Sequence, residues 1–318
     1  MKNIVVLYTG DDWDTMVLSD MTRRAFEEWH EKGLQEGVAF FRSSIDWYDD
    51  ARGVFKKGWA YREKEWHRID EPIVPTGVYD KTVGTSNLAL TERKLGMLRF
   101  FSVINHPFFG LFLDNKFSQA LLFKDIMPQT ALVHSITELE EKAKQFSGER
   151  IVLKPLSGSG GNGVRILDKN ALGSEHLEFP LLLQAFIEAY RGIPGFSEEA
   201  SVADLRLVYI DGTLAYALSR VARTDSLLTN FHQGAPPLAV PLTAIPSDTQ
   251  ALANKIAEQL SLFPKSIFSL DFMHDKNGKP LLIEMNTKPG FDLLFLLGDE
   301  QLKNSYFRRF LSLFPNTL

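Results

Sequence analysis

One segment, residues 151–167, restricts the possible folds most, because in it a glycine-rich loop joins two strand-like runs. The runs IVLKP and VRIL are apolar and β-branched, which is typical of strands, and the loop reads SGSGGNG. Successive backbone amides in such a loop can cradle a phosphate group. No helix pattern follows the loop and it lacks Gly-Lys-Ser/Thr, which argues against the P-loop and dinucleotide-binding folds. Considered alone, the loop is equally well explained as a flexible hairpin loop.

A second feature is a predicted hairpin that carries three oxygen-bearing side chains. The run IFSLD ends at Asp271, an Asn-Gly turn signal follows, and the run LLIEMN contains Glu284 and Asn286. Residues two apart on a strand share a face, so Glu284 and Asn286 point the same way, and the turn can bring Asp271 beside them. Two carboxylates and an amide oxygen are hard ligands of the kind that Mg²⁺ takes. The alternative is a pair of solvated acids on an edge hairpin.

A third feature is a set of cations in apolar segments. Lys154 lies inside the strand-like run before the glycine loop, where a lysine is ordinarily avoided. An inward lysine needs an anionic partner, and the adjacent loop suggests phosphate. Lys116, Arg206, Arg220 and Arg223 add further cations. Any one of them alone is better explained as a surface charge or structural ion pair, and they gain weight only together with the acidic hairpin.

Composition excludes several classes of protein. The 318 residues carry 35 basic and 40 acidic side chains, a net charge of −5, which offers no basic footprint for nucleic acid. The chain has no cysteine, which excludes disulfides, thiolate metal sites and cysteine nucleophiles. The first apolar run is too short for a signal peptide, and the apolar windows at 100–113 and 293–297 are too interrupted or too short to span a membrane. We therefore expect a soluble, cytoplasmic protein.

The periodicity predicts a mixed α/β and α+β chain. Strands are expected at 4–8, 38–42, 59–62, 66–69, 78–80, 151–155, 164–167, 181–187, 205–210, 214–221, 266–273 and 280–285. Helices are expected at 20–30, 92–103, 116–126, 136–146 and 248–260, the fourth opened by a capping box that begins at Ser135. The aromatic-rich region 47–68 fits either a ligand platform or packing, and we favour packing.

Together and in this order, these features resemble the ATP-grasp superfamily, most closely its RimK-like and glutathione-synthetase-like branch, including spore-coat-associated relatives. The resemblance covers roughly two-thirds of the chain, residues 114–290. It is carried by VLKPLSGSGGNGV (152–164), LLLQAFIE (181–188), ADLRLVYIDG (203–212), SRVARTDSLLTNFHQGA (219–235), SLDF (269–272) and IEMNTKPG (283–290).

The resemblance implies an ATP-grasp fold in three parts. These are an N-terminal α/β (pre-ATP-grasp) domain with a parallel sheet at 1–112, a central lid subdomain at 113–187 and a C-terminal metal-binding subdomain at 188–318. ATP would lie between the last two parts. The first ~110 residues match the family only in the opening strand, and the family usually sets its acceptor specificity there.

The resemblance also implies the cofactors, ATP and Mg²⁺, with two ions expected, and the residues that hold them. The residues implied in nucleotide binding are Lys116, Lys154, Ser157, Gly158, Ser159, Gly160, Gly161, Gly163, Gln184, Phe186, Ile187, Glu188 and Asn230. The implied metal ligands are Asp271, Glu284 and Asn286. Arg206 and Arg220 are the implied catalytic residues, near the transferred phosphoryl group or the substrate carboxylate.

The implied activity is that of an ATP-dependent carboxylate–amine ligase, which forms an amide or peptide bond through an acyl phosphate and releases ADP and phosphate. Its partners would be small-molecule or peptide acids and amines, without nucleic acid or membrane, and a homodimer is left open. Two alternatives stay open: a small-molecule kinase on the same scaffold, and a non-catalytic nucleotide-binding protein.

Overall fold

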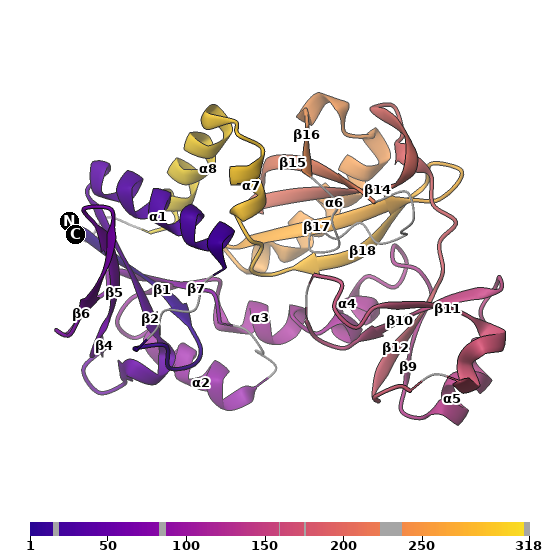
Figure 1. Cartoon of the computed structure of the whole chain (residues 1–318), viewed down its shortest axis with the longest axis horizontal. Helices are drawn as coiled ribbons and strands as arrows, with labels where there is room; N and C mark the ends of the chain where they lie inside the picture. Colours follow the sequence, from indigo (N-terminus) through magenta and orange to yellow (C-terminus); the bar gives the residue numbers. More distant parts are fainter. Residues whose placement is uncertain (15–18, 83–86, 159, 175, 223–236, 315–318) are drawn as a thin grey trace.

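Three larger β-sheets with helices packed on them follow one another along the described chain, and β3 and β4 form a small two-stranded sheet beside the first (Figure 1). The computed structural model describes residues 1–14, 19–82, 87–158, 160–174, 176–222 and 237–314. Its mixture of helices and strands agrees with the predicted α/β and α+β class. Among the helices it describes, none is both long and apolar enough to cross a bilayer.

The first sheet has the strand order β6-β5-β2-β1-β7-β8, with the apolar strand β1 near its centre. Ile4, Val5 and Leu7 of β1 are 0% exposed, as expected for a strand covered on both faces. β1 pairs in parallel with β2 and β7, whereas β5 and β6 form an antiparallel hairpin at one edge. The elements of this region are β1 (Lys2–Tyr8), α1 (Asp20–Gln35), β2 (Val38–Ser44), η1 (Ile45–Trp47), β3 (Tyr48–Asp49), β4 (Val54–Phe55), β5 (Gly58–Arg62), β6 (Glu65–Ile69), β7 (Gly77–Asp80), α2 (Leu88–Met97), β8 (Ser102–Ile104) and α3 (Pro107–Leu113).

The aromatic-rich region is a packed cluster. Trp47 and Trp59 are 5% and 7% exposed and gather with Tyr8. Trp13 packs edge-on against Trp47, with 5.5 Å between ring centroids. The burial supports packing, which we favoured from the sequence, over a ligand platform.

Three predicted helices are wrong in their extent, and the one expected at 20–30 is α1, which continues to Gln35. The helix expected at 92–103 is α2, which ends at Met97, and the residues after it turn into β8. There Val103 pairs with Val78 of β7 and is 4% exposed, so joining the free edge of β7 buries it in the sheet. The helix expected at 116–126 ends at Leu122, and turn residues follow it, in which the amides of Ile126 and Met127 both donate to the Phe123 carbonyl (3.0 and 2.9 Å).

The second sheet is antiparallel, with the order β11-β10-β12-β9. Ser135 caps the helix packed on it, since its hydroxyl accepts from the Glu138 amide at 3.2 Å, as the capping box predicts. The elements are α4 (Lys116–Leu122), β9 (Thr130–Val133), α5 (Ile136–Ala143), β10 (Arg150–Pro155), β11 (Arg165–Asp168), η2 (Lys169–Ser174) and β12 (Leu181–Ala185). The glycine loop joins β10 to β11, which confirms the strand–loop–strand prediction.

The third sheet has the order β16-β15-β14-β17-β18, and β13 pairs with β14. Its elements are β13 (Arg191–Ile193), β14 (Ser197–Ile210), β15 (Thr213–Val221), β16 (Pro237–Val240), η4 (Leu242–Ala244), α6 (Ser247–Gln259), η5 (Leu260–Leu262), β17 (Ile267–His274), β18 (Pro280–Asn286), α7 (Asp292–Leu296) and α8 (Glu300–Ser312). β14 begins earlier than predicted because its first residues pair with β13.

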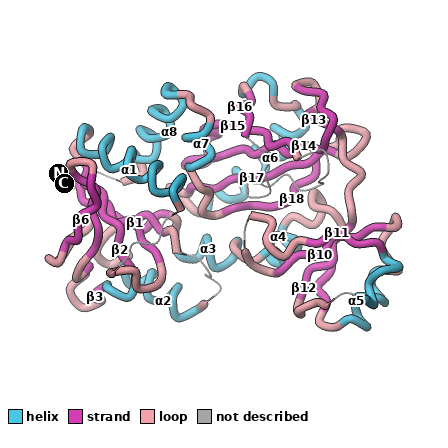
Figure 2. Tube along the Cα trace, in the orientation of Figure 1, coloured by secondary structure: helices cyan, strands magenta, loops and turns pink. Residues whose placement is uncertain are grey.

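Helices α7 and α8 return to the first sheet (Figure 2). Trp29 of α1 stacks on Phe291 with 4.1 Å between ring centroids, and Phe310 of α8 lies 4.5 Å from Trp29 and 4.9 Å from Tyr79 of β7. One core therefore joins the beginning and the end of the described chain. The domain limits 1–112, 113–187 and 188–318 stay a prediction.

Candidate functional site

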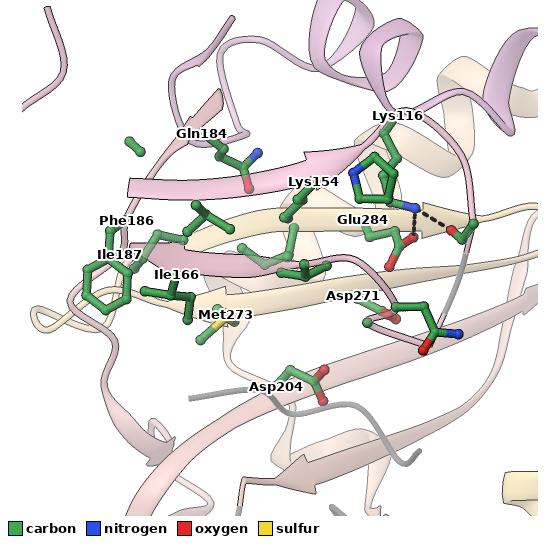
Figure 3. A pocket seen from close by; sticks show the side chains of 18 of the residues that line it. Lys116, Lys154, Ile166, Gln184, Phe186, Ile187, Asp204, Asp271, Met273 and Glu284 are labelled. Carbon is green, nitrogen blue, oxygen red and sulfur yellow. Dashed lines mark hydrogen bonds and ion pairs between the residues drawn. The ribbon is translucent and has the colours of Figure 1, made fainter. Parts of the chain in front are cut away.

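A cleft of about 910 Å³, the first cleft, lies between the second and third sheets (Figure 3). Strands of both sheets supply its walls, and the glycine loop closes one end. Its lining residues are Lys116, Val152, Lys154, Pro155, Gly158, Gly161, Asn162, Val164, Ile166, Gln184, Ala185, Phe186, Ile187, Asp204, Arg220, Asp271, Met273, Ile283 and Glu284. A concave, mostly apolar site with a few convergent polar groups is typical of small-molecule binding.

The C-terminal hairpin has the predicted geometry. β17 and β18 pair antiparallel, with Asp271 opposite Glu284 and Ser269 opposite Asn286. The turn between them contains Gly278 at φ +82°, a conformation that favours glycine. The Nδ2 of Asn286 donates to Asp271 Oδ2 at 3.4 Å, so the three predicted ligands are together.

Two arginines hold Asp271 in its ionised form. Arg206 donates to both carboxylate oxygens, at 2.7 and 2.6 Å, and Arg220 donates to Oδ2 at 3.0 Å. Arg220 also forms an ion pair with Asp204. Burial alone would raise the pKa of Asp271, but the two guanidinium groups outweigh it and lower the pKa to about 2.

The three grouped side chains fit a hard divalent cation. Among the described residues, Asp271 Oδ1 accepts a hydrogen bond from Arg206 Nε alone, and Asn286 directs its NH₂ toward Asp271, which leaves its amide oxygen as an acceptor. Glu284 Oε1 pairs with Lys116, and Oε2 is the second carboxylate oxygen. In the described part of the chain no three carboxylate or imidazole groups gather as a metal cluster. The candidate donor set is two carboxylates and one amide, and its assignment as a metal site stays a prediction.

Two lysines provide positive charge beside the hairpin. Lys116 begins α4, where Asn115 caps the helix, and its Nζ lies 2.7 Å from Glu284 Oε1. Lys154 on β10 is 8% exposed and lines the first cleft, and no described residue pairs with its ammonium group. Burial lowers the pKa of Lys154 to about 8, with a partly compensating contribution from Glu284. An anion in the cleft would relieve that cost.

The glycine loop lies over the same region. Gly158 accepts a hydrogen bond from Lys116 Nζ through its carbonyl, and Gly158 and Gly161 line the first cleft. Gly158, Gly160, Gly161 and Gly163 all have positive φ, which explains the glycines. Of the predicted loop residues, Ser157, Gly160 and Gly163 do not line the first cleft, and Ser159 lies outside the described residues.

The residues around the end of β12 that the resemblance implies in nucleotide binding lie mostly in the first cleft. Gln184, Phe186 and Ile187 line the first cleft, and Gln184 donates to Thr130 at 3.0 Å. Glu188 does not line the cleft, because its exposed side chain pairs with Lys276 at 2.7 Å. The predicted position of Asn230 falls outside the described residues.

A second cleft, of about 970 Å³, adjoins the first and shares Arg220 and Glu284 with it. Its lining comes from α1, the end of β7, the third sheet and the segment after β18. The lining residues are Thr22, Ala25, Phe26, Lys81, Gly160, Arg206, Arg220, Glu284, Asn286, Lys288, Pro289, Gly290, Phe291, Asp292 and Leu293. The aromatic side chains Trp59, Tyr61 and Trp66 line neither cleft.

Sequence reasoning missed several of these residues. Asp204 lies two positions before Arg206 on a strand, a same-face spacing that could have indicated it. Lys81 and Asp292 carry no local signal. The apolar wall of the first cleft, which includes Ile166 and Met273, also went unnoticed because such residues look like ordinary core.

Two buried amide side chains hold the hairpin in place. Gln119 of α4 donates to the carbonyls of Leu113 (2.6 Å) and Met285 (2.8 Å) and accepts from the Met285 amide (2.9 Å). Met285 stands between Glu284 and Asn286. Asn105 bonds both backbone groups of Ile267 at 2.7 Å. These bonds fix the backbone that carries the candidate ligands.

Comparison with known proteins places the chain in a family. Residues 115–286, more than half of the chain, match the model of the prokaryotic glutathione synthetase ATP-grasp domain. A probable alpha-L-glutamate ligase of Vibrio parahaemolyticus is 26% identical over 166 residues, 52% of this chain and 52% of the relative. The corresponding protein of Thioalkalivibrio sulfidiphilus is 28% identical over 236 residues, 73% of each chain. The chain spans about half the length of the first of these relatives.

Solved structures share the fold along almost the whole chain. D-alanyl-alanine synthetase A from Vibrio cholerae has a TM-score of 0.62 at 11% identity and covers 99% of both chains. The ATP-grasp ligase PsnB, complexed with minimal precursor, Mg and ADP, has a TM-score of 0.62 at 15% identity over 98% of this chain and 97% of its own. A RimK domain ATP-grasp protein from Sphaerobacter thermophilus has a TM-score of 0.60 at 14% identity over 99% of this chain and 100% of its own. By the family match, the chain belongs to the family of the prokaryotic glutathione synthetase ATP-grasp domain, and the solved structures share its fold.

Proposed function

We propose that this protein is an ATP-dependent carboxylate–amine ligase. The observation that carries the proposal is the junction of the two clefts at Arg220 and Glu284. A nucleotide in the first cleft would direct its terminal phosphate toward a carboxylate in the second. Holding two reactants in contact in this way supplies much of the rate of such reactions.

In this proposal ATP binds in the first cleft with its base among the apolar side chains and its phosphates near the lysines. Val152, Ile166 and Met273 would contact the base, and Gln184 lies at the same end. Lys154 and Lys116 would neutralise phosphate charge beneath the glycine loop. The buried ammonium group of Lys154, which no described residue pairs, supports this role, because burying a charge without a partner is costly.

Asp271, Glu284 and Asn286 would hold Mg²⁺. When bound there, Mg²⁺ would neutralise phosphate charge and orient the terminal phosphoryl group. The two arginines keep Asp271 ionised, and Gln119 fixes the backbone between the other two ligands. The resemblance implies two such ions at this site.

The reaction consists of two balanced steps. A carboxylate oxygen of the acid bonds to the γ-phosphorus and ADP leaves, which gives an acyl phosphate. The amine nitrogen then bonds to the acyl carbon, loses a proton, and phosphate leaves with the oxygen that came from the acid. Arg220, at the junction, would stabilise negative charge during both steps.

A coupled assay for ADP and for free phosphate tests the proposal with panels of acids and amines. A ligase releases both products in equal amounts only when an acid and an amine are present together. ADP without free phosphate, together with a phosphorylated substrate, would identify the kinase alternative. Mg·ATP binding without turnover for any pair, unchanged in Glu284→Ala, would identify the non-catalytic alternative.

The limits 1–112, 113–187 and 188–318 are our proposal for the domains of this ligase. We also propose that it acts in the cytoplasm, where ATP and Mg²⁺ are supplied. The reducing cytoplasm prevents stable disulfides, and a chain without cysteine forms none.

A further inference from the structure

Two opposite charges that line the second cleft have no ionic side-chain partner among the described residues. Most of the charged groups in its lining already have ionic side-chain partners. These pairs are Arg206 with Asp271, Arg220 with Asp204 and Asp271, Glu284 with Lys116, and Lys288 with Asp114. Among the described lining residues, Lys81 and Asp292 are the charges without such a pair.

Lys81 is held in a fixed position by backbone groups. Its Nζ donates to the carbonyl oxygens of Lys288 (2.8 Å) and Pro289 (3.0 Å). Its own backbone amide donates to the Leu7 carbonyl at 2.8 Å, which ties it to the central strand of the first sheet. An ammonium group has three donors, so one N–H is left for the cleft that the residue lines.

Asp292 occupies the first turn of α7, which begins after the segment that contains Lys288 and Pro289. Its carboxylate lies where a side chain at position 290 would stand, so Gly290 makes room for it. Asp292 acts on Lys81 electrostatically, since it opposes the lowering of the Lys81 pKa that burial causes. No ion pair joins the two among the described contacts, so each charge can be used by a bound molecule.

We propose that Lys81 and Asp292 are a specificity pair, which binds the carboxylate and the ammonium group of one amino-acid substrate in the second cleft. The role of this amino acid in a reaction rests on the ligase proposal. The predicted binding of the amino acid does not depend on that proposal. The substrate side chain would lie against Ala25, Phe26 and Leu293, which line the same cleft. A free amino acid satisfies both charges, whereas the N-terminus of a peptide brings the ammonium group without a neighbouring carboxylate.

Binding measurements test the pair without requiring turnover. Wild-type protein with Mg·ADP is titrated by calorimetry with the twenty free amino acids, and the tightest binder is compared with its amide and with its deaminated acid. We expect each analogue to bind at least about tenfold more weakly, since a charge-assisted hydrogen bond is worth about 1.5–3 kcal/mol. Equal binding of the amino acid and its amide would overturn the proposal, whatever the variants do.

Variants then assign each charge to its residue. Lys81→Met should weaken binding of the amino acid at least tenfold and leave binding of its amide unchanged. Asp292→Asn should weaken binding of the amino acid and leave binding of the deaminated acid unchanged. A general structural defect would weaken all three probes together, and that result would contradict the pair. Lys303→Met, in a buried lysine outside both clefts, and Asp248→Asn, in the first turn of α6, are the matched controls.

Turnover separates this inference from the ligase proposal. If an acid and an amine support ADP release but no amino acid shows the expected group dependence, the specificity pair is wrong and the ligase proposal stands. If the group dependence is found and no acid–amine pair ever yields ADP, the specificity pair stands and the ligase proposal fails.

Discussion

Replacing Lys154 by methionine should make the ligand-free protein more stable while it weakens nucleotide binding. Burial lowers the pKa of Lys154 from 10.5 to about 8. At 1.36 kcal/mol per pKa unit, the buried charge costs the folded state about 3 kcal/mol. Methionine fills a similar volume without that charge, so the free energy of unfolding should rise by about 2 to 3 kcal/mol at pH 7.

The sign of the pH dependence follows from the lowered pKa. Below pH 8 Lys154 is protonated in both the folded and the unfolded chain, and the full cost is present. Between pH 8 and 10.5 the unfolded chain keeps a proton that the folded chain has lost, so wild-type stability rises with pH. The advantage of Lys154→Met should therefore be complete below pH 8 and shrink toward pH 10.5.

Urea unfolding at several pH values measures this effect, and calorimetry with Mg·ATP should show affinity at least about tenfold weaker. Lys94→Met is the matched control, because Lys94 is 1% exposed but pairs with Asp80 at 2.7 Å. Breaking that pair leaves a buried carboxylate and should destabilise by about 3–5 kcal/mol. The reasoning is refuted if Lys154→Met lowers stability as Lys94→Met does, or if it keeps full ATP affinity.

Three further outcomes are expected. Gln119→Leu leaves the Met285 backbone unpaired and should cost about 3 kcal/mol in urea unfolding, with weaker Mg·ATP binding; unchanged ATP binding would contradict its positioning role. Burial lowers the pKa of His30 to about 3, so stability should fall as pH drops from 6.5 toward 3, and His30→Gln should flatten that slope in thermal melts. Asn286→Leu should raise the Mg²⁺ concentration for half-maximal ADP release on the order of tenfold, whereas an unchanged requirement would remove Asn286 from the metal site.

The hairpin that carries the candidate ligands could be predicted because its signals are local. Period-two alternation places Glu284 and Asn286 on one face, and the Asn-Gly turn brings Asp271 opposite Glu284. The glycine loop could be predicted for the same reason, since positive φ demands glycine whatever the surrounding fold.

The second cleft could not be predicted, because it exists only after distant segments meet. Lys81 follows a strand of the first sheet, Asp292 follows β18 of the third sheet, and Lys81 reaches the segment before Asp292 through the carbonyls of Lys288 and Pro289. Nothing around Lys81 in the sequence distinguishes it from a surface lysine. The end of the helix expected at 92–103 was wrong for a similar reason, since the pairing of Val103 with β7 prevailed over helical periodicity.

Isotope transfer from the acid to phosphate tests the ligase account most directly. An acid labelled with ¹⁸O in its carboxylate is incubated with the amine, Mg²⁺ and ATP, and the released phosphate is analysed by mass spectrometry. Acyl-phosphate chemistry predicts one ¹⁸O atom in each phosphate and one in each amide product. Unlabelled phosphate, or a label that stays wholly with the acid, would contradict it.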